Sequence, residues 1–242
     1  MSKFSQLYQK LYQTLCGRHP YLRPWHFQWL VSRPIYADLQ RVLARQTGQV
    51  LDVGCGDGPY HRWLPITATV VGIDIYPGRG VNILSVPEQP WPLQSASFDT
   101  VLCTQVLEHV TNVDLLLQEI KRVLKPGGYL ICTVPFIYNV HGAPHDYRRF
   151  STYGLQQQLG AAYEIIELQG QGRIGSSLGT LLLNWLEQMF NHYRLTRFLK
   201  AALLPFWLLF CAGVNTGCLL LDQVDVTAAY YNNVLLVARK CV

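Results

Sequence analysis

Residues 50–58 read Val-Leu-Asp-Val-Gly-Cys-Gly-Asp-Gly, and this stretch decides the fold. An apolar run leads directly into a turn in which every second residue is glycine. Glycine permits a sharp backbone turn and the close approach of a ligand. Twenty residues after Gly54, a second apolar run ends in Asp74, whose carboxylate can accept hydrogen bonds from a ribose diol. Together the two features predict a nucleoside-binding crevice.

The third glycine position argues against a dinucleotide ligand. A dinucleotide fingerprint has the spacing Gly-x-Gly-x-x-Gly, and Pro59 occupies its last position here. The turn is therefore poorly suited to holding a pyrophosphate at a helix N-terminus. A nucleoside cofactor without a diphosphate is favoured. By itself the turn is also compatible with an ordinary strand-to-helix connection of an α/β protein.

The composition limits the classes of protein. A length of 242 residues allows one large domain or one domain with an elaboration. Half of the residues are hydrophobic, and the charged fraction of 14% is well below the usual quarter. The net charge of +5 comes from scattered basic residues, and no nucleic-acid partner is expected. Seven cysteines without a Cys-x-x-Cys pair predict neither a disulfide framework nor a metal site. Residues 1–15 are amphipathic and do not resemble a signal peptide, so a cytoplasmic protein is expected.

Alternating apolar runs predict the secondary structure. An amphipathic helix is expected over residues 4–15, a loop over 18–34 and a second helix over 35–46. Strands are expected at 49–53, 70–74, 81–84, 99–103, 129–134, 163–168 and 231–239. Asn112 is expected to cap a helix that Pro126-Gly127-Gly128 stops. Strands and helices in alternation predict an α/β fold with a doubly wound, seven-stranded, mostly parallel sheet and a ligand at the carboxyl ends of its strands.

An apolar insertion precedes the last strand. One helix face is formed by Leu178, Leu182, Trp185, Met189 and Tyr193. The basic residues Arg194, Arg197 and Lys200 follow it in the sequence. Residues 201–221 carry no charge. We therefore divide the chain into an N-terminal helical cap (1–48), a nucleoside-binding domain (49–170 with 230–242) and a hydrophobic helical insertion (171–229).

The length of residues 201–221 would suit a transmembrane helix, but topology argues against a single crossing. The strands before and after the insertion belong to one sheet, and about ten residues cannot recross a bilayer as a helix. Pro205, Gly213, Asn215 and Gly217 are expected to break the segment. Two interpretations stay open: an apolar hairpin at the inner face of a membrane, with its basic residues on anionic lipid, or a soluble lid or dimer surface.

Four ordered motifs resemble the class I S-adenosylmethionine-dependent methyltransferases, in the type 11 group. They are residues 50–58, Gly72-Ile73-Asp74, the pair of segments 98–101 and 106–110, and 124–130. The resemblance covers about residues 49–169 and the last strand. It implies a Rossmann-like methyltransferase fold with S-adenosylmethionine as the cofactor, and it says little about the methyl acceptor.

The resemblance also implies which residues bind the cofactor. Gly54, Cys55 and Gly56 would line its methionine part, with Asp52 ordering the ammonium group and with Thr104 and Gln105 nearby; Asp74 would hold the ribose hydroxyls and Ile75 would pack on the adenine. The family often has an acidic residue after the third strand, and this chain has none before Glu88. Backbone groups or Ser85 are the replacement contacts for the adenine amine.

The loop after the fifth strand contains the candidates for catalysis. Residues 141–150 resemble a His-x-x-Pro-x-Asp-Tyr-x-Arg-Phe segment found in bacterial methyltransferases of this group. We expect His141 or His145 to act as the base and Asp146 to orient that base or the acceptor. Tyr147 and Arg149 are the candidates for substrate binding, and the alternative is that Asp146 and Arg149 form a structural pair. His109 is expected to cap a helix or to pack.

The expected function is methyl transfer from S-adenosylmethionine to oxygen or nitrogen of a small-molecule, lipid or lipid-linked glycan acceptor. The apolar insertion favours the lipid classes, and the oligomeric state stays open. One alternative is a non-catalytic cofactor-binding or membrane-adaptor protein. Another is a nucleotide-dependent oxidoreductase, which Pro59 disfavours.

Overall fold

The structure is a computed structural model that describes residues 10–15 and 23–241. Residues 10–15 are helical, and the rest of the helix predicted over 4–15 lies outside the described residues. The chain forms two compact units. The helical unit comprises Met1–Pro34, Ile137–Asn139 and Gln171–Asn232, and the sheet unit comprises Ile35–Phe136, Val140–Gly170 and Asn233–Val242. The unit boundaries differ from the predicted ones, because residues 35–48 belong with the sheet and residues 1–34 with the insertion.

The sheet has seven strands in the order β3-β2-β1-β4-β5-β7-β6. Their bounds are β1 Gly48–Val53, β2 Ala68–Asp74, β3 Ile83–Leu84, β4 Phe98–Thr104, β5 Leu124–Pro135, β6 Tyr163–Gln171 and β7 Asn233–Lys240. The strands β1 to β5 pair in parallel, and β7 runs antiparallel to β5 with Asn233 opposite Pro135. All seven predicted strands are therefore present, and the strands on either side of the insertion are neighbours.

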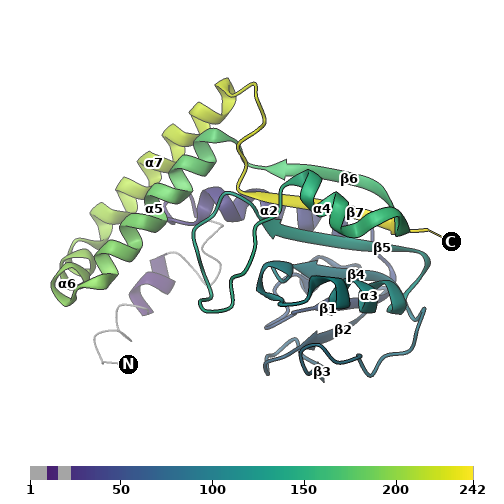
Figure 1. Ribbon diagram of the computed structural model, residues 1–242. Coiled ribbons are helices and arrows are strands. Elements are labelled where there is room, and N and C mark those ends of the chain that lie inside the picture. The colour runs from purple at the N-terminus through teal and green to yellow at the C-terminus, as the bar shows by residue number, and fades with distance from the viewer. Residues whose placement is uncertain (1–9, 16–22, 242) are drawn as a thin grey trace. The chain divides into compact units, whose positions relative to one another are not determined.

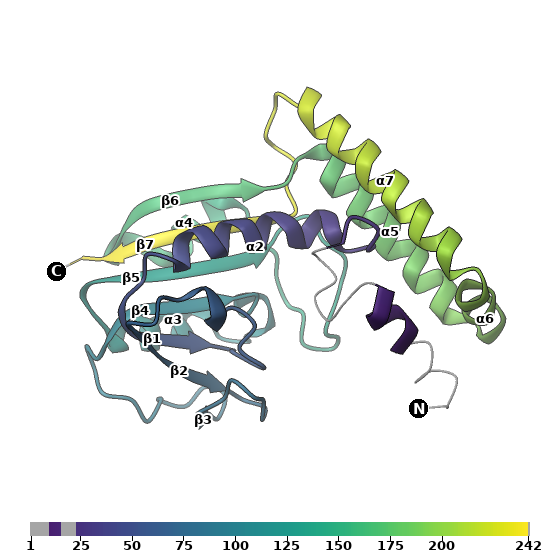
Figure 2. The ribbon, with the colours of Figure 1, turned by 180° about the vertical axis from the view of Figure 1, so that it is seen from behind.

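Helices cover both faces of the sheet. Figures 1 and 2 show the Ile35–Leu43 part of α2 (Trp29–Leu43) on one face, and α3 (Val113–Val123) and α4 (Thr152–Leu159) on the other. The central strands are accordingly apolar and buried along most of their length. The ends of β1, β2 and β4 therefore provide a rigid edge from which the site residues project.

The first half of the sheet departs from strict alternation of strand and helix. Residues 54–67 contain only the 3-10 helix η2 (His61–Trp63), and residues 75–82 and 85–97 contain no helix. Pro59 and Pro65 flank η2 and limit its length. Its aromatic residues pack against α2, because the rings of Tyr36, Tyr60 and Trp63 lie with their centroids 5.1–5.8 Å apart.

Two predicted helix boundaries are wrong by several residues. The helix α2 begins at Trp29, inside the predicted loop, because Val31, Ile35 and Leu39 form one buried stripe that outweighs the missing N–H of Pro34. The helix α3 ends at Val123, before the Pro-Gly-Gly segment, because β5 already begins with the next residue. Its predicted cap is confirmed: Asn112 Oδ1 accepts a hydrogen bond from Leu115 N at 3.1 Å.

The insertion forms a helical hairpin of α5 (Ile174–His192), α6 (Arg194–Ala202) and α7 (Leu204–Val224). Both ribbon views show α5 and α7 side by side (Figures 1 and 2). By length and composition, α7 is the one helix among the described residues that could cross a membrane, and 22% of its most apolar 18-residue window is buried.

Residues 201–221 are interrupted next to Pro205, because α6 ends at Ala202 and α7 begins at Leu204. The breaks predicted at Gly213, Asn215 and Gly217 do not occur, because α7 is continuous to Val224. Pro205 lies at the start of the helix, where its missing N–H has no intrahelical partner to lose. At Gly213 and Gly217 an added Cβ would meet no atom within 4 Å. Asn215 is buried, and its Nδ2 donates to the carbonyl oxygens of residues 24 and 26 at 2.6 and 2.9 Å.

Candidate active site

The glycine turn leaves open space beside one of its residues. Gly54, Gly56 and Gly58 have φ values of +67°, +50° and +65°, which other residues rarely adopt. A Cβ added to Gly54 would approach Val106 Cγ2 to 2.4 Å, so this glycine permits close packing against the residue after Gln105. A Cβ added to Gly56 would meet nothing within 4 Å. A ligand therefore has room beside Gly56.

The acid at the end of β2 faces this turn. Asp74 Oδ2 accepts from Gly56 N at 2.9 Å, and its Oδ1 accepts from Tyr76 N at 3.0 Å. The adjacent Ile75 is half exposed, as a residue that packs on a ligand ring has to be. Ser85 Oγ lies 3.4 Å from the Asp74 carbonyl oxygen. The structure thus gathers these predicted ribose and adenine contacts around the carboxylate of Asp74.

Asp52 and Cys55 are buried beneath the turn. Asp52 Oδ2 lies 2.8 Å from His61 Nε2; burial raises the pKa of Asp52, and the bond to His61 opposes this shift. Burial raises the pKa of the Cys55 thiol to about 12, so this cysteine packs as a neutral group. The partnership with His61 was missed from the sequence, where the only signal was a single histidine after Pro59.

Three strands meet at the carboxyl end of β4. Gln105 has a positive φ of 56°, a strained conformation that clusters at functional sites. Its backbone N–H donates to the Thr133 carbonyl oxygen at 2.8 Å, and its Nε2 to Asn233 Oδ1 at 3.3 Å. Thr104 Oγ1 and Asn233 Nδ2 are buried without a hydrogen-bond partner. These two atoms are what a polar ligand at this edge would satisfy.

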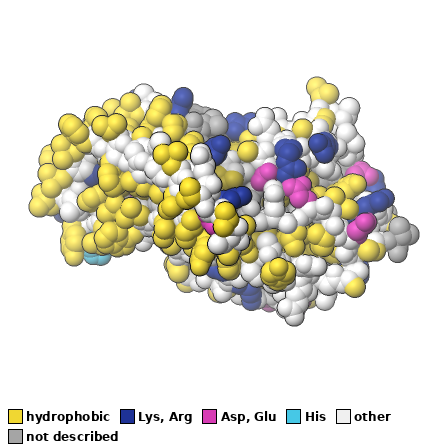
Figure 3. All heavy atoms as spheres, turned by 90° about the horizontal axis from the view of Figure 1, so that it is seen from above, with side chains coloured by type: hydrophobic (Ala, Val, Ile, Leu, Met, Phe, Trp, Pro, Cys, Tyr) yellow, Lys and Arg dark blue, Asp and Glu magenta, His cyan; other side chains and the backbone are white. Residues whose placement is uncertain are grey.

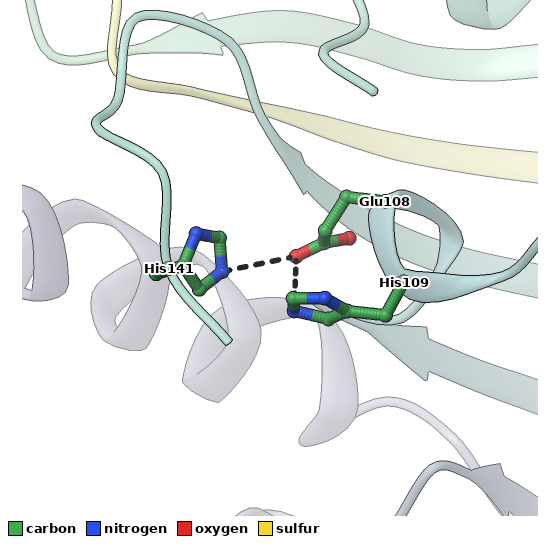
Figure 4. A group of neighbouring side chains, drawn as sticks. All are labelled: Glu108, His109 and His141. Atoms are coloured by element: carbon green, nitrogen blue, oxygen red, sulfur yellow. Dashed lines mark ion pairs between the residues drawn. The ribbon is translucent and has the colours of Figure 1, made fainter. Parts of the chain in front are cut away.

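A buried carboxylate, that of Glu108, lies three residues after Gln105 in the sequence. Glu108 lies in the 3-10 helix η3 (Leu107–His109), its exposed fraction is 0%, and both of its carboxylate oxygens lack a hydrogen-bond partner. His109 Nε2 and His141 Nε2 lie 3.7 and 3.8 Å from its Oε1 (Figure 4). Burial raises the pKa of Glu108 to about 7. We call these three side chains the Glu108 cluster.

Asp146 holds His141 in this place. Its Oδ2 accepts from His141 N at 2.8 Å and lies 3.3 Å from His141 Nδ1. Arg149 binds both carboxylate oxygens of Asp146, at 2.5 and 2.7 Å, and these hydrogen bonds lower the pKa of Asp146. Asp146 therefore orients His141, and the Asp146–Arg149 pair that we considered as a structural alternative is present. The proposed contact of Arg149 with substrate stays a prediction.

His145 occupies a different position on the same loop. Its Nδ1 lies 2.8 Å from the Tyr147 hydroxyl, and its carbonyl oxygen is bonded to His109 Nδ1. Tyr147 N donates to the Glu108 carbonyl oxygen at 2.8 Å, while its side chain is partly exposed. Of the two predicted bases, the structure therefore places His141 in the cluster, whereas His145 contributes a backbone carbonyl.

Sequence reasoning underrated Glu108 and His109. The segment Val106-Leu107-Glu108-His109-Val110 served only to identify the fold, and His109 was assigned to capping or packing. The available signal was a carboxylate next to a histidine at a strand end. Its partner His141 lies on the loop after the following strand, and no spacing rule connects the two segments.

This sheet order with one antiparallel strand, the glycine turn and the acid after β2 define a Rossmann-like methyltransferase fold. The family described as Methyltransferase domain matches residues 51–132. Residues 51–132 therefore match a methyltransferase domain, in agreement with the predicted fold and with S-adenosylmethionine as the predicted cofactor.

Curated relatives share this domain over part of their lengths. A tRNA U34 carboxymethyltransferase of Saccharophagus degradans is 31% identical over 125 residues, which cover 44% of this chain and 37% of the relative. A ubiquinone biosynthesis O-methyltransferase of Paraburkholderia phymatum is 27% identical over 184 residues, which cover 62% of this chain and 75% of the relative. The chain thus spans little more than a third of the first relative.

A solved structure shows the same fold. An S-adenosylmethionine-dependent methyltransferase from Mesorhizobium loti is 15% identical with a TM-score of 0.53, and the alignment covers 87% of this chain and 100% of that chain. At this level of identity the likeness concerns the fold alone, because one fold hosts many functions.

Proposed function

We propose that the protein transfers a methyl group from S-adenosylmethionine to a hydroxyl group of a lipid or lipid-linked acceptor. One observation carries the cofactor assignment. Open space beside Gly56 lies in the turn that Asp74 supports, and the unpartnered Thr104 Oγ1 and Asn233 Nδ2 lie at the same sheet edge. The O-methyltransferase of ubiquinone biosynthesis, to which the chain is similar, supports oxygen as the methylated atom.

The residues fit the cofactor group by group. When bound, S-adenosylmethionine supplies a methyl group activated on a sulfonium sulfur. Each oxygen of Asp74 accepts one backbone hydrogen bond and keeps a lone pair for a ribose hydroxyl. Thr104 and Asn233 offer a hydroxyl and an amide to the polar methionine end. The side chain of Gln105, which directly follows Thr104, donates to Thr133 of β5 and to Asn233 of β7. These bonds fix Thr104 and Asn233 relative to each other.

The reaction requires a proton acceptor. Transfer breaks one sulfur–methyl bond and forms one oxygen–methyl bond, and the acceptor hydroxyl loses its proton while the sulfonium becomes a neutral thioether. We assign the uptake of this proton to the Glu108 cluster, which begins three residues after Gln105. The pKa of Glu108, about 7, is close to that of an effective base at neutral pH. Asp146 positions His141 beside it.

The helical hairpin supports the lipid character of the acceptor, because many of its large apolar side chains are exposed. The interior of the hairpin is mixed. It contains an apolar cluster of Leu183, Leu204, Trp207, Leu208 and Cys211. It also contains small and polar residues, namely Gly175, Ser176, Ser177, Gly179, Thr180, Asn184 and Asn215. Large apolar residues are exposed: Leu178, Leu182, Trp185, Met189, Tyr193, Phe198, Leu203, Phe206, Leu209, Phe210, Leu220 and Val224. Figure 3 shows hydrophobic side chains gathered over this hairpin. A soluble amphipathic helix presents charged and polar residues on its outer face instead.

The contacts within the hairpin resemble those of helices packed in lipid. A Cβ added to Gly175 would lie 2.0 Å from the Cys218 carbonyl oxygen, so the backbones of α5 and α7 are in direct contact there. A Cβ added to Gly179 would approach Cys218 Sγ to 2.7 Å. Small residues that allow such approach, with polar groups between the helices, are typical of membrane helix pairs.

The charges of the hairpin fit an anionic bilayer. Lys200 is buried and bonded to Glu187 Oε1 at 2.7 Å, so it contributes little positive charge to the surface. Arg194 and Arg197 of α6 are exposed among apolar side chains. Because β6 and β7 are neighbours in one sheet, the hairpin leaves and returns to the same side. We therefore propose a monotopic hairpin on the cytoplasmic face of a membrane, with the arginines among lipid headgroups.

Calorimetric titration tests the cofactor and labelled transfer tests the reaction. We expect S-adenosylhomocysteine to bind and NAD not to bind. Incubation with methyl-labelled S-adenosylmethionine and membrane lipid extract should then label an extractable lipid. Binding of S-adenosylhomocysteine without labelling of any lipid or polar extract would favour the non-catalytic alternative. Binding of NAD alone would contradict the proposal.

Flotation with anionic phosphatidylglycerol vesicles tests the membrane contact. We expect the protein to float, and the double variant Phe206→Glu, Leu209→Glu to stay in the dense fraction, because both side chains are about 70% exposed on α7. The matched control Ile66→Glu, Tyr153→Glu changes two exposed apolar residues of the sheet unit and should float. If the unmodified protein stays in the dense fraction and forms a dimer that the α7 variant dissociates, the hairpin is a dimer surface and the proposal is wrong.

A further inference from the structure

The Glu108 cluster raises a question of charge. Glu108 is completely buried, and neither carboxylate oxygen has a hydrogen-bond partner. A buried polar group without a partner is costly, and a buried charge requires a cation or a strong donor. The ring nitrogens His109 Nε2 and His141 Nε2 lie 3.7 and 3.8 Å from Oε1. These distances are too long for hydrogen bonds.

The same distances suit ligands of one metal ion. The three ligand atoms all lie within 4.8 Å of one another. Two nitrogen or oxygen ligands bound at about 2.0–2.2 Å to a tetrahedral ion are roughly 3.4 Å apart. The two distances from Glu108 Oε1 exceed this spacing by a few tenths of an ångström, so a small inward movement of the histidines would bring the ligand atoms around one ion. In Figure 4 both imidazole rings approach the carboxylate from the loops after β4 and β5.

The outer contacts orient both histidines for such binding. His109 Nδ1 is bonded to the carbonyl oxygen of His145, and His141 Nδ1 lies 3.3 Å from Asp146 Oδ2. In each ring the Nε2 atom is therefore the one directed at Glu108. A metal-binding histidine commonly donates its other ring N–H to a carbonyl or carboxylate oxygen. His109 has this contact, and His141 Nδ1 faces Asp146 at ion-pair distance. Arg149 in turn fixes Asp146 through two hydrogen bonds.

We propose that Glu108, His109 and His141 bind one divalent transition-metal ion. Two imidazoles and one carboxylate form the ligand set of open Zn²⁺ and Fe²⁺ sites, whereas Mg²⁺ and Ca²⁺ prefer oxygen ligands. Three protein ligands leave at least one position for water or an acceptor oxygen. The sequence predicted no metal because cysteine spacing was the criterion, and this site uses no cysteine. The proposal concerns ion binding and does not depend on methyl transfer. With an ion bound, Glu108 would be an ionised ligand, so the proton uptake proposed above belongs to the metal-free cluster.

Spectroscopic titration with Co²⁺ tests the site directly. The full-length protein is stripped with a chelator, desalted and titrated with Co²⁺, whose visible absorption reports nitrogen and oxygen ligation. We expect one equivalent to bind, Zn²⁺ to displace it, and Mg²⁺ at the same concentration to leave it in place. No visible band and no bound ion would overturn the proposal, and the cluster would then be a proton-sharing group.

Matched variants locate the ligands. Glu108→Gln should weaken Co²⁺ binding by more than about tenfold, and Asp146→Asn by about 10–100-fold through loss of orientation. His145→Gln, on the same loop, is the control and should bind as the unmodified protein does, because that residue contributes only its backbone carbonyl to His109. If Glu108→Gln does not fold by circular dichroism, His109→Gln replaces it, since that ring is partly exposed. Equal affinity in the ligand and control variants would contradict the assignment.

Discussion

Replacing Gly56 by alanine separates the cost of a left-handed backbone from the cost of blocking the cofactor. The chain offers a matched control in Gly160, the residue that ends α4. The two glycines have φ values of +50° and +65°, and a Cβ added to either would meet no atom within 4 Å. Both substitutions therefore lack a steric clash within the protein. Gly56→Ala should lower the free energy of unfolding by about 1–2 kcal/mol, the cost of a left-handed L-residue. Gly160→Ala should lower it by more, because φ +65° with ψ −164° is a conformation that is essentially restricted to glycine.

Only one of the two changes should affect cofactor binding. Gly56 lies in the turn supported by Asp74, so its new methyl group would occupy the space assigned to S-adenosylmethionine. We expect Gly56→Ala to weaken S-adenosylhomocysteine binding at least tenfold, which is about 1.4 kcal/mol. Gly160→Ala should leave that affinity unchanged.

Two measurements on each variant decide the matter. Urea unfolding gives the loss of stability, and calorimetric titration at a temperature where both variants are folded gives the affinity. The expected result is that Gly160→Ala loses more stability, whereas only Gly56→Ala loses affinity. If both variants bind S-adenosylhomocysteine as tightly as the unmodified protein, the space beside Gly56 is not the cofactor site and our reasoning about the turn is refuted.

Three further predictions concern stability. In the chelator-treated protein, the raised pKa of Glu108 means that its protonated form stabilises the fold relative to its ionised form. The free energy of unfolding should therefore fall as the pH rises from about 4.5 to about 7. Urea unfolding at successive pH values should show that Glu108→Gln removes up to about 3 kcal/mol of this loss. Gly175→Ala should destabilise the hairpin by about 3 kcal/mol because its Cβ meets the Cys218 carbonyl oxygen, whereas Gly213→Ala, in open space on α7, should stabilise it by about 1 kcal/mol; equal thermal unfolding of the two would contradict the packing described. Asn112→Ala should cost about 1 kcal/mol in chemical denaturation through loss of the α3 cap, and an unchanged midpoint would show that the cap contributes nothing.

The sequence by itself determined the strands, the glycine turn and the acid at the end of β2. These features are local, because a strand and its following turn are encoded in contiguous residues whose apolar pattern and glycine content restrict the backbone directly. The same locality explains why Asn112 was correctly identified as a helix cap. The prediction was wrong in the first half of the sheet, where loops and η2 stand in place of the expected helices. Those helices were inferred from the alternation of strands and helices and not from a local helical pattern.

Only the tertiary structure decided which side chains meet. Glu108 and His141 come from loops after two different strands, and Gln105 contacts Asn233 from the far end of the chain. Local patterns contain no information on such meetings, because they depend on strand order and on the path of each loop. Tertiary contacts also decided which face of the hairpin helices is buried. The apolar stripe from Leu178 to Tyr193 was evident in the sequence, but the close backbone contact at Gly175 decided that the small residues face inward and the apolar stripe faces outward.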